Sequence, residues 1–137
     1  MTAISLPARL AALARTAPGS IALTGEDGDL TYAALEERVA TATTRLAGEW
    51  AVVAGERIAF LGFNHVDQIT LLAALMRLGA LLVPLNYRLA IAELRAIAGH
   101  AGIAQVVADD HHAAIAGALG VPVRARDALV APRRGER

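Results

Sequence analysis

Two short apolar runs with a helical segment between them dominate the hydrophobic pattern. Arg57 to Leu61 follows a glycine turn, Ala80 to Leu85 is a second run, and His65 to Leu78 has the length and spacing of a helix. Both runs are almost continuously apolar, as is typical of parallel strands covered on both faces. The pattern therefore predicts two parallel strands joined by a crossover helix in the middle layer of the fold.

The predicted crossover helix is apolar around most of its circumference, including Ile69 and Met76. Four positions spaced three or four residues apart form a narrow stripe without large apolar side chains: Asp67, Thr70, Ala74 and Arg77. We expect this stripe to face water and the rest of the helix to be buried.

Further elements lie on both sides of this unit. Before it, the pattern predicts a helix capped by Ser5, a hairpin of Ile21–Thr24 and Asp29–Thr31, and a helix over residues 32–47. After it, the pattern predicts helix 91–101, strand 105–108, helix 111–119 and strand 121–124. This alternation predicts an α/β fold with three layers: a doubly wound, mostly parallel sheet with helices on both faces, plus a small N-terminal hairpin.

Two details of this pattern concern exposed segments. On the helix over residues 32–47, the side chains expected to face water are Glu36, Glu37, Arg38, Thr41 and Arg45. Residues 126–137 contain a proline, a glycine and four arginines without apolar periodicity, and we predict a linker or disordered tail there. The packed unit is accordingly predicted to span residues 1–125.

Composition narrows the possible functions. A chain of 137 residues is about the size of one domain, and its 55% hydrophobic and 4% aromatic content predicts a core of Ala, Leu, Val and Ile. Thirteen acidic and thirteen basic side chains cancel, so net charge does not indicate a nucleic-acid partner. All basic residues are arginine, and cysteine is absent. The lack of cysteine excludes disulfides, zinc-thiolate sites and a thiol nucleophile, and it fits a cytoplasmic protein.

We expect neither a membrane span nor a signal peptide. The longest apolar region, Ile69 to Leu85, is interrupted by an arginine, a glycine and a proline, whereas a span needs roughly 20 apolar residues. Arg9 and Arg15 fall inside the segment that would have to be the apolar part of a signal peptide.

Several common catalytic patterns are absent or weak. The chain has no Gly-x-Gly-x-x-Gly or Gly-x-x-x-x-Gly-Lys loop, and Ser5 and Ser20 lack the context of a serine nucleophile. A receiver-type phosphoacceptor domain needs a lysine that this chain lacks. Adjacent residues on a helix point about 100° apart, so His111 and His112 are predicted to be solvated or capping residues rather than metal ligands. Asn64 is predicted to cap the crossover helix, and no catalytic or metal-binding residue is assigned.

Asn86, Tyr87 and Arg88 directly follow the second central strand, at the edge of the sheet where doubly wound folds bind ligands. The forked donors of Arg88 suit a phosphate or a carboxylate. Arg88 could equally be a surface residue paired with Glu93. This loop is therefore a candidate anion-binding site, with both interpretations open.

Six stretches of the chain occur in an informative order and spacing. They are Leu30–Leu35, Gly55–Ala59, Asn64, Gly79–Leu89, Glu93–Leu94 and Ala101–Ala104. Together they resemble the start of the adenylate-forming enzymes, the acyl-CoA synthetase and acid-CoA ligase superfamily. The resemblance covers residues 6 to 110 and implies that residues 1–125 are the N-terminal subdomain of an AMP-binding enzyme.

The resemblance implies a ligase that activates a carboxylic acid with ATP to an acyl-adenylate and then forms a thioester with coenzyme A, in fatty acid or aromatic acid metabolism. It implies that Arg88 lies near the phosphates of coenzyme A, with Asn86 and Tyr87 shaping the same loop. The family's phosphate loop and its two lysines match nothing in these residues. The full-length enzyme is expected to use ATP, Mg and coenzyme A, whereas the isolated chain is expected to bind none of them and to be inactive.

Two functional hypotheses follow. In the first, the chain is the N-terminal portion of an acid-CoA ligase, and the remainder of the ligase or a second copy covers an exposed apolar face. In the second, it is a standalone, non-catalytic binding or interaction module with the same α/β subdomain fold. The chain would take part in catalysis only in the first case, as part of a full-length acyl-CoA synthetase, and residues 1–137 alone would not be an enzyme.

Overall fold

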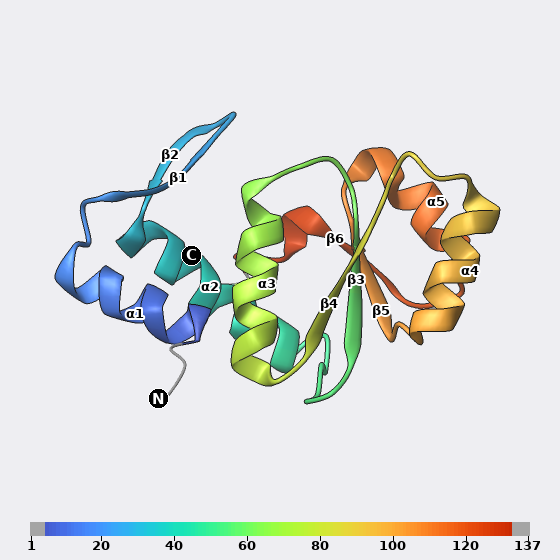
Figure 1. Ribbon diagram of the computed structural model, residues 1–137, viewed down its shortest axis with the longest axis horizontal. Helices are drawn as coiled ribbons and strands as arrows, with labels where there is room; N and C mark the ends of the chain where they lie inside the picture. The colour runs from blue at the N-terminus through green and yellow to red at the C-terminus, as the bar shows by residue number, and fades with distance from the viewer. Residues whose placement is uncertain (1–4, 133–137) are drawn as a thin grey trace.

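The central sheet is parallel throughout and has the strand order β4-β3-β5-β6. Its strands are β3 (Arg57–Leu61), β4 (Leu81–Leu85), β5 (Gln105–Ala108) and β6 (Val123–Ala125). The computed structural model shown in Figure 1 describes residues 5–132 of the chain. The parallel pairing of β3 with β4 confirms the crossover predicted from the two apolar runs.

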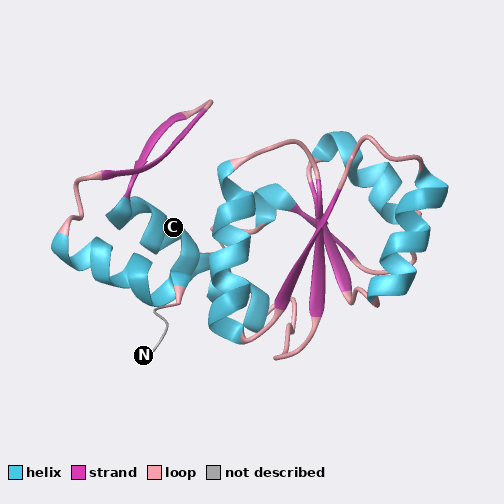
Figure 2. Cartoon of the chain, in the orientation of Figure 1, coloured by secondary structure: helices cyan, strands magenta, loops and turns pink. Residues whose placement is uncertain are grey.

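Helices cover both faces of this sheet, as Figure 2 shows. On one side lies α3 (Val66–Leu78), with α2 (Tyr32–Ala47) packed against it, and on the other side lie α4 (Ile91–Ala101) and α5 (Ala113–Gly117). Two cores result. Ile58 and Phe60 of β3 belong to the core with α2 and α3, and Ala59 and Leu61 belong to the core with α4 and α5. The three-layer α/β prediction is therefore confirmed.

The N-terminal part matches the local signals of the sequence. The Ser5 hydroxyl accepts a hydrogen bond from the Ala8 N–H at 3.3 Å and caps α1 (Leu6–Thr16), and the Thr31 hydroxyl caps α2 in the same way. Between these helices, β1 (Ile21–Gly25) and β2 (Gly28–Thr31) form the predicted antiparallel hairpin. The hairpin projects beside α2, away from the central sheet (Figure 1).

The polar stripe of α3 is buried, so the expectation that it would face water is wrong. Asp67, Thr70 and Ala74 are 3%, 0% and 0% exposed, whereas Ile69 and Met76 are 39% and 42% exposed. The helix is therefore rotated relative to the prediction, with small and polar residues inward and two large apolar residues outward.

Two ion pairs with α2 explain this rotation. Arg38 of α2 bonds to the Asp67 carboxylate, and Arg77 bonds to the Glu36 carboxylate of α2 at 2.5 Å. The polar stripe of α3 thus has its charge partners on the neighbouring helix, and its small side chains let the two helices approach each other.

The segment after β6 belongs to the packed structure, which corrects the boundary predicted at residue 125. It forms the 3₁₀ turn η2 (Arg126–Ala128), and Leu129 is fully buried in the core with α2 and α3. Arg45, predicted to face water, is buried and donates a hydrogen bond to the carbonyl oxygen of Ala131. Of the predicted linker, residues 133–137 lie outside the described residues.

Two smaller boundaries also differ from the sequence prediction. The predicted helix 111–119 begins as the 3₁₀ turn η1 (Asp110–His112) and continues as the shorter α5. The last strand begins two residues later than predicted, because Val121 and Pro122 precede the ladder that pairs Val123 with Val106.

Strand β4 forms one edge of the sheet, and within residues 5–132 no strand pairs with its outer side. The Leu81 N–H donates to the Glu56 carbonyl at 2.8 Å on the β3 side, so the alternating peptide groups of Leu82 and Pro84 point outward. Proline has no N–H, so this edge lacks one donor. The Leu81 side chain is 51% exposed at the same edge.

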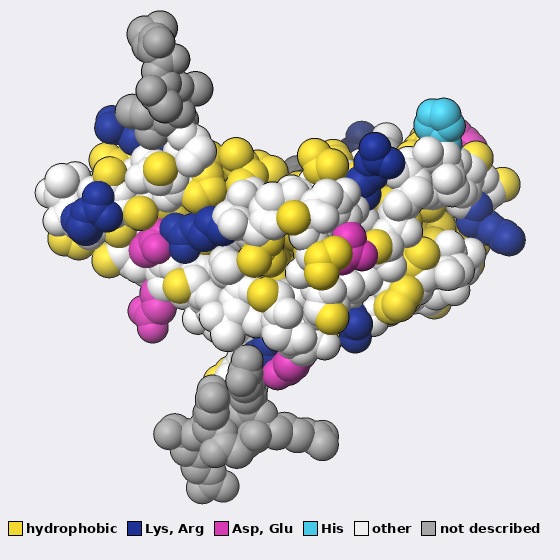
Figure 3. Space-filling view, turned by 90° about the horizontal axis from the view of Figure 1, so that it is seen from below, with side chains coloured by type: hydrophobic (Ala, Val, Ile, Leu, Met, Phe, Trp, Pro, Cys, Tyr) yellow, Lys and Arg dark blue, Asp and Glu magenta, His cyan; other side chains and the backbone are white. Residues whose placement is uncertain are grey.

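Charged and apolar side chains share the outer surface. Seen from below, apolar groups lie between arginine and acidic side chains instead of forming one block (Figure 3). In the part of the chain that the structure covers, the helices are too short and too polar to cross a bilayer.

Two matched aspartate substitutions test the orientation of α3. We expect Ala74→Asp to destabilise the protein by about 3 kcal/mol, because it places a carboxylate in the closed interface with α2. We expect Met76→Asp to change stability by less than about 1 kcal/mol, because that side chain already meets water. Thermal unfolding of both variants would reveal the difference, and equal losses would contradict the observed orientation.

Candidate functional site

Three loops meet at the carboxyl ends of the central strands: Gly62–His65 after β3, Asn86–Leu89 after β4 and Asp109–His112 after β5. The chain leaves β3 for α3 on one face of the sheet and leaves β5 for α5 on the other. Neighbouring parallel strands whose connections diverge in this way form the crevice where doubly wound folds bind ligands. This edge is therefore the candidate functional site.

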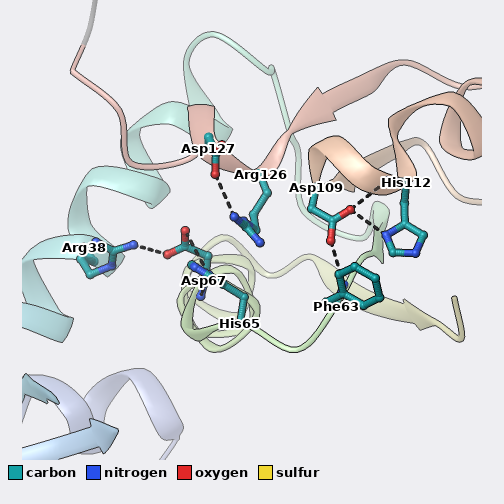
Figure 4. Close-up of polar contacts among 8 residues, drawn as sticks. All are labelled: Arg38, Phe63, His65, Asp67, Asp109, His112, Arg126 and Asp127. Atoms are coloured by element: carbon teal, nitrogen blue, oxygen red, sulfur yellow. Dashed lines mark hydrogen bonds and ion pairs between the residues drawn. The ribbon is translucent and has the colours of Figure 1, made fainter. Parts of the chain in front are cut away.

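A buried carboxylate closes the crevice between β3 and β5. One oxygen of Asp109 accepts a hydrogen bond from the Phe63 N–H at 2.8 Å. The other oxygen accepts from the His112 N–H at 2.9 Å and lies 2.6 Å from Nδ1 of the His112 ring. Figure 4 shows the carboxylate between Phe63 and His112. Asp109 thus ties the two exit loops together.

Gly62 is required by this arrangement. A methyl group at this position would lie 2.8 Å from the Asp109 Oδ2 atom, which is closer than real Cβ contacts allow. The residue therefore leaves room for the carboxylate.

Four rings gather above the carboxylate. The Phe63 ring centroid lies 4.9 Å from that of Tyr87, 4.9 Å from His111 and 4.7 Å from His112. The Tyr87 and His112 centroids are 5.3 Å apart. His112 is 4% exposed and Phe63 is 42% exposed, so the cluster has a buried base and an open surface. We call Phe63, Tyr87, His111 and His112 the ring cluster.

The two adjacent histidines have different environments. His112 is buried and its Nδ1 faces Asp109, whereas His111 is exposed on the ring cluster. Over residues 5–132 no group of three or more histidine or acidic side chains is arranged to hold a metal ion. In the structure His112 serves as a buried partner of a carboxylate, which differs from the solvated or capping role predicted for it.

The environment of Asp109 controls its charge. Burial disfavours the ionised form, but the hydrogen bonds from the Phe63 N–H and from His112 outweigh burial and lower the pKa of Asp109 below its ordinary value of 3.8. The carboxylate is therefore ionised at neutral pH.

The predicted anion-binding loop lies next to the ring cluster. The Asn86 Oδ1 atom accepts a hydrogen bond from the Arg88 N–H at 3.0 Å, the Tyr87 ring belongs to the cluster, and the Arg88 guanidinium lies 5.7 Å from the Tyr87 ring centroid. In the described chain no ion pair joins Arg88 to Glu93, whose carboxylate instead accepts from the Ala90 N–H at 3.4 Å. Arg88 is exposed and directed over an aromatic ring.

Asn64 does not cap α3, although the sequence predicts that it would. The cap is His65, whose Nδ1 accepts a hydrogen bond from the Asp67 N–H at 3.0 Å. This bond requires an unprotonated Nδ1. His65 is therefore part of the polar network that also contains Asp67 and Arg38 (Figure 4).

A groove of about 820 Å³ separates the hairpin from the start of α3. Its lining includes Arg38, His65 and the acidic side chains of the hairpin turn. The Arg38 charge is already paired with Asp67, and the carboxylates of Glu26, Asp27 and Asp29 do not suit an anion. The groove is therefore a weaker candidate for ligand chemistry than the edge with the ring cluster.

A glycine pair tests the closed crevice. We expect Gly62→Ala to destabilise the protein by about 1–3 kcal/mol, because the new methyl group collides with Asp109. We expect Gly99→Ala, an exposed position in α4 with open space around it, to stabilise the protein by roughly 0.5–1 kcal/mol. Unfolding midpoints would distinguish the two, and a neutral Gly62 variant would contradict the contact.

The lowered pKa of Asp109 predicts a pH dependence. Its ionised form stabilises the fold at pH values above its unfolded pKa near 3.8, and this stabilisation disappears as the pH falls through the still lower folded pKa. The stability difference between the wild type and Asp109→Asn should therefore shrink as the pH falls below about 4. A difference that stays constant down to pH 2.5 would contradict the assignment.

Comparison with known proteins gives the family. The sequence profile of the AMP-binding enzyme family matches residues 10–133. A feruloyl-CoA synthase of Amycolatopsis is 36% identical over 106 residues, which is 77% of this chain and 21% of that enzyme. The chain therefore spans about a fifth of the length of this relative.

Solved structures agree with this match. The crystal structure of VinN superposes with a TM-score of 0.84 at 27% identity, covering 90% of this chain and 33% of VinN. An O-succinylbenzoate coenzyme A synthetase from Bacillus subtilis, solved in complex with AMP, gives a TM-score of 0.79 at 25% identity, covering 88% of this chain and 32% of the synthetase. The chain belongs to the AMP-binding enzyme family and corresponds to the N-terminal part of these adenylate-forming enzymes.

Proposed function

We propose that this chain is the N-terminal portion of an ATP-dependent acid-CoA ligase and that the loop from Asn86 to Arg88 contacts coenzyme A. The observation that carries the proposal is the position of Arg88, an exposed cation without a carboxylate partner in the described chain, at the carboxyl edge of a parallel sheet. The names of the relatives support thioester formation with coenzyme A as the reaction class.

The chemistry of coenzyme A fits this edge of the sheet. Its nucleotide carries phosphate groups, which the forked donors of a guanidinium bind in pairs. It also carries adenine, a planar ring that can stack on exposed aromatic side chains. Arg88 offers the first kind of contact and the open surface of the ring cluster offers the second. The two are adjacent, because the Arg88 guanidinium lies 5.7 Å from the centroid of the Tyr87 ring, which belongs to the cluster.

The remaining parts of the reaction lie outside these residues. Adenylation needs cationic groups beside the ATP phosphates, and the family supplies lysines that this chain does not contain. We therefore propose that ATP and Mg bind in the full-length enzyme through other segments, and that residues 1–137 alone are inactive. In this proposal the chain supplies a surface for the thiol substrate and no catalytic residue.

The proposed partner of the chain is the remainder of the ligase. Ile69 and Met76 on α3 and Leu81 on β4 present large apolar side chains to solvent. We propose that these side chains contact more protein, from the same polypeptide or from a second copy. We also propose that the full-length ligase acts on a carboxylic acid and is located in the cytoplasm. The alternative of a non-catalytic module predicts that the full-length protein forms no acyl-adenylate.

Substitution of Arg88 tests the proposal in the full-length protein. We expect Arg88→Ala to raise the KM for coenzyme A about tenfold, as for loss of one charged hydrogen-bond pair, and to change acid-dependent pyrophosphate exchange less than about twofold. The matched control is Arg95→Ala, which removes an exposed arginine from α4. Equal losses in adenylation and in thioester formation would contradict the assignment of Arg88. Absence of pyrophosphate exchange in the wild type would favour the alternative of a non-catalytic module.

A further inference from the structure

Asp109 is almost fully buried, and both of its carboxylate oxygens accept hydrogen bonds from the chain, which leaves little of it open to a ligand. Its bonds span two loops that are 46 residues apart in the sequence. A capping residue needs only the bond to the His112 N–H. The bonds to the Phe63 N–H and to the His112 ring are therefore additional, and they fix the backbone at Phe63 and the ring of His112.

Both of these rings contact Tyr87. The Phe63 ring meets it edge-on, at 4.9 Å and an interplanar angle of 78°, and the His112 ring lies 5.3 Å away at 48°. Tyr87 is thus packed against the rings of two residues that bond to one carboxylate, Phe63 through its backbone N–H and His112 through its ring. Aromatic pairs in such arrangements stabilise each other by about 0.5–1.5 kcal/mol beyond area burial, so the rings hold one another in place.

The rest of the Tyr87 loop is held by local bonds. Asn86 accepts hydrogen bonds from Arg88 through its side chain, at 3.0 Å, and from Leu89 through its carbonyl, at 3.1 Å. These bonds shape the turn, but they do not attach it to the loops of the other strands. The Tyr87 ring makes that attachment, and the Arg88 guanidinium lies 5.7 Å above the same ring.

We propose that Asp109 is a positioning residue for the coenzyme A face, acting through the Phe63 and His112 rings on Tyr87 and hence on Arg88. This inference rests on the proposed function of the Asn86–Arg88 loop. The Asp109 carboxylate lies between the exit loops of the diverging strands β3 and β5, and from that position it sets the geometry of the adjacent Asn86–Arg88 loop.

The test uses the full-length protein with Asp109→Asn. The substituted amide places a donor where Asp109 presents an acceptor, so one of its three bonds is lost while the size of the side chain is kept. We expect the KM for coenzyme A to rise three- to tenfold, with acid-dependent pyrophosphate exchange changed less than twofold. The matched control, Asp110→Asn, removes the neighbouring exposed carboxylate and should leave both values unchanged.

A double variant separates this inference from the proposed function. If Asp109 acts through Arg88, Asp109→Asn should raise the KM for coenzyme A no further once Arg88→Ala is present. If the two substitutions raised the KM for coenzyme A by the product of their separate effects, the inference would be overturned. An unchanged KM in Asp109→Asn alone would also overturn it. If Arg88→Ala by itself left the KM for coenzyme A unchanged, the proposed function of the loop would be overturned instead.

A second variant covers the case in which Asp109→Asn does not fold. His112→Phe keeps a ring beside Phe63 and Tyr87 but removes the contact with Asp109, and we expect it to raise the KM for coenzyme A two- to fivefold. Crystal structures of the variants should show the Tyr87 ring displaced from Phe63. An unmoved Tyr87 ring, or failure of both variants to fold, would overturn the inference.

Discussion

A parallel sheet without a polar face must be covered by apolar side chains on both sides, and most of this structure follows from that constraint. The side chains of β3 alternate between the two cores, Ile58 and Phe60 toward one and Ala59 and Leu61 toward the other. Each crossover must therefore return on a definite face, with α3 on one side and α4 on the other. The chain leaves β3 for α3 on one face and β5 for α5 on the other, and this divergence places the ends of β3 and β5, and with them Asp109, at the centre of the carboxyl edge.

Local patterns predicted the elements well because their signals are local. The bounds of α4 and β5, the caps at Ser5 and Thr31, and the hairpin all depend on residues within a few positions of one another. The orientation of α3 could not be obtained in this way. Its polar stripe looks like a wet face until Arg38, 29 residues from Asp67 in the sequence, is brought alongside. Composition of a helix does not say whether its polar side meets water or another helix.

The same limit applies to the candidate site. Asn86, Tyr87 and Arg88 were found because they follow an apolar strand, and the structure brings Tyr87 into the ring cluster. The bond between Asp109 and Phe63 had no local signal, since it joins two strand exits that become neighbours only in the sheet. Leu129 was missed for a similar reason, because a single buried leucine shows no periodicity.

The proline in the edge strand β4 has a consequence for solubility. An open strand edge is a template on which another chain can build a ladder, and long regular edges promote aggregation. Pro84 has no N–H, so the outer side of β4 lacks a hydrogen-bond donor at this position. The pyrrolidine ring also occupies the space that an incoming backbone would approach. Other molecules can therefore meet this rim through side chains such as Leu81, but a continuous intermolecular sheet is disfavoured there.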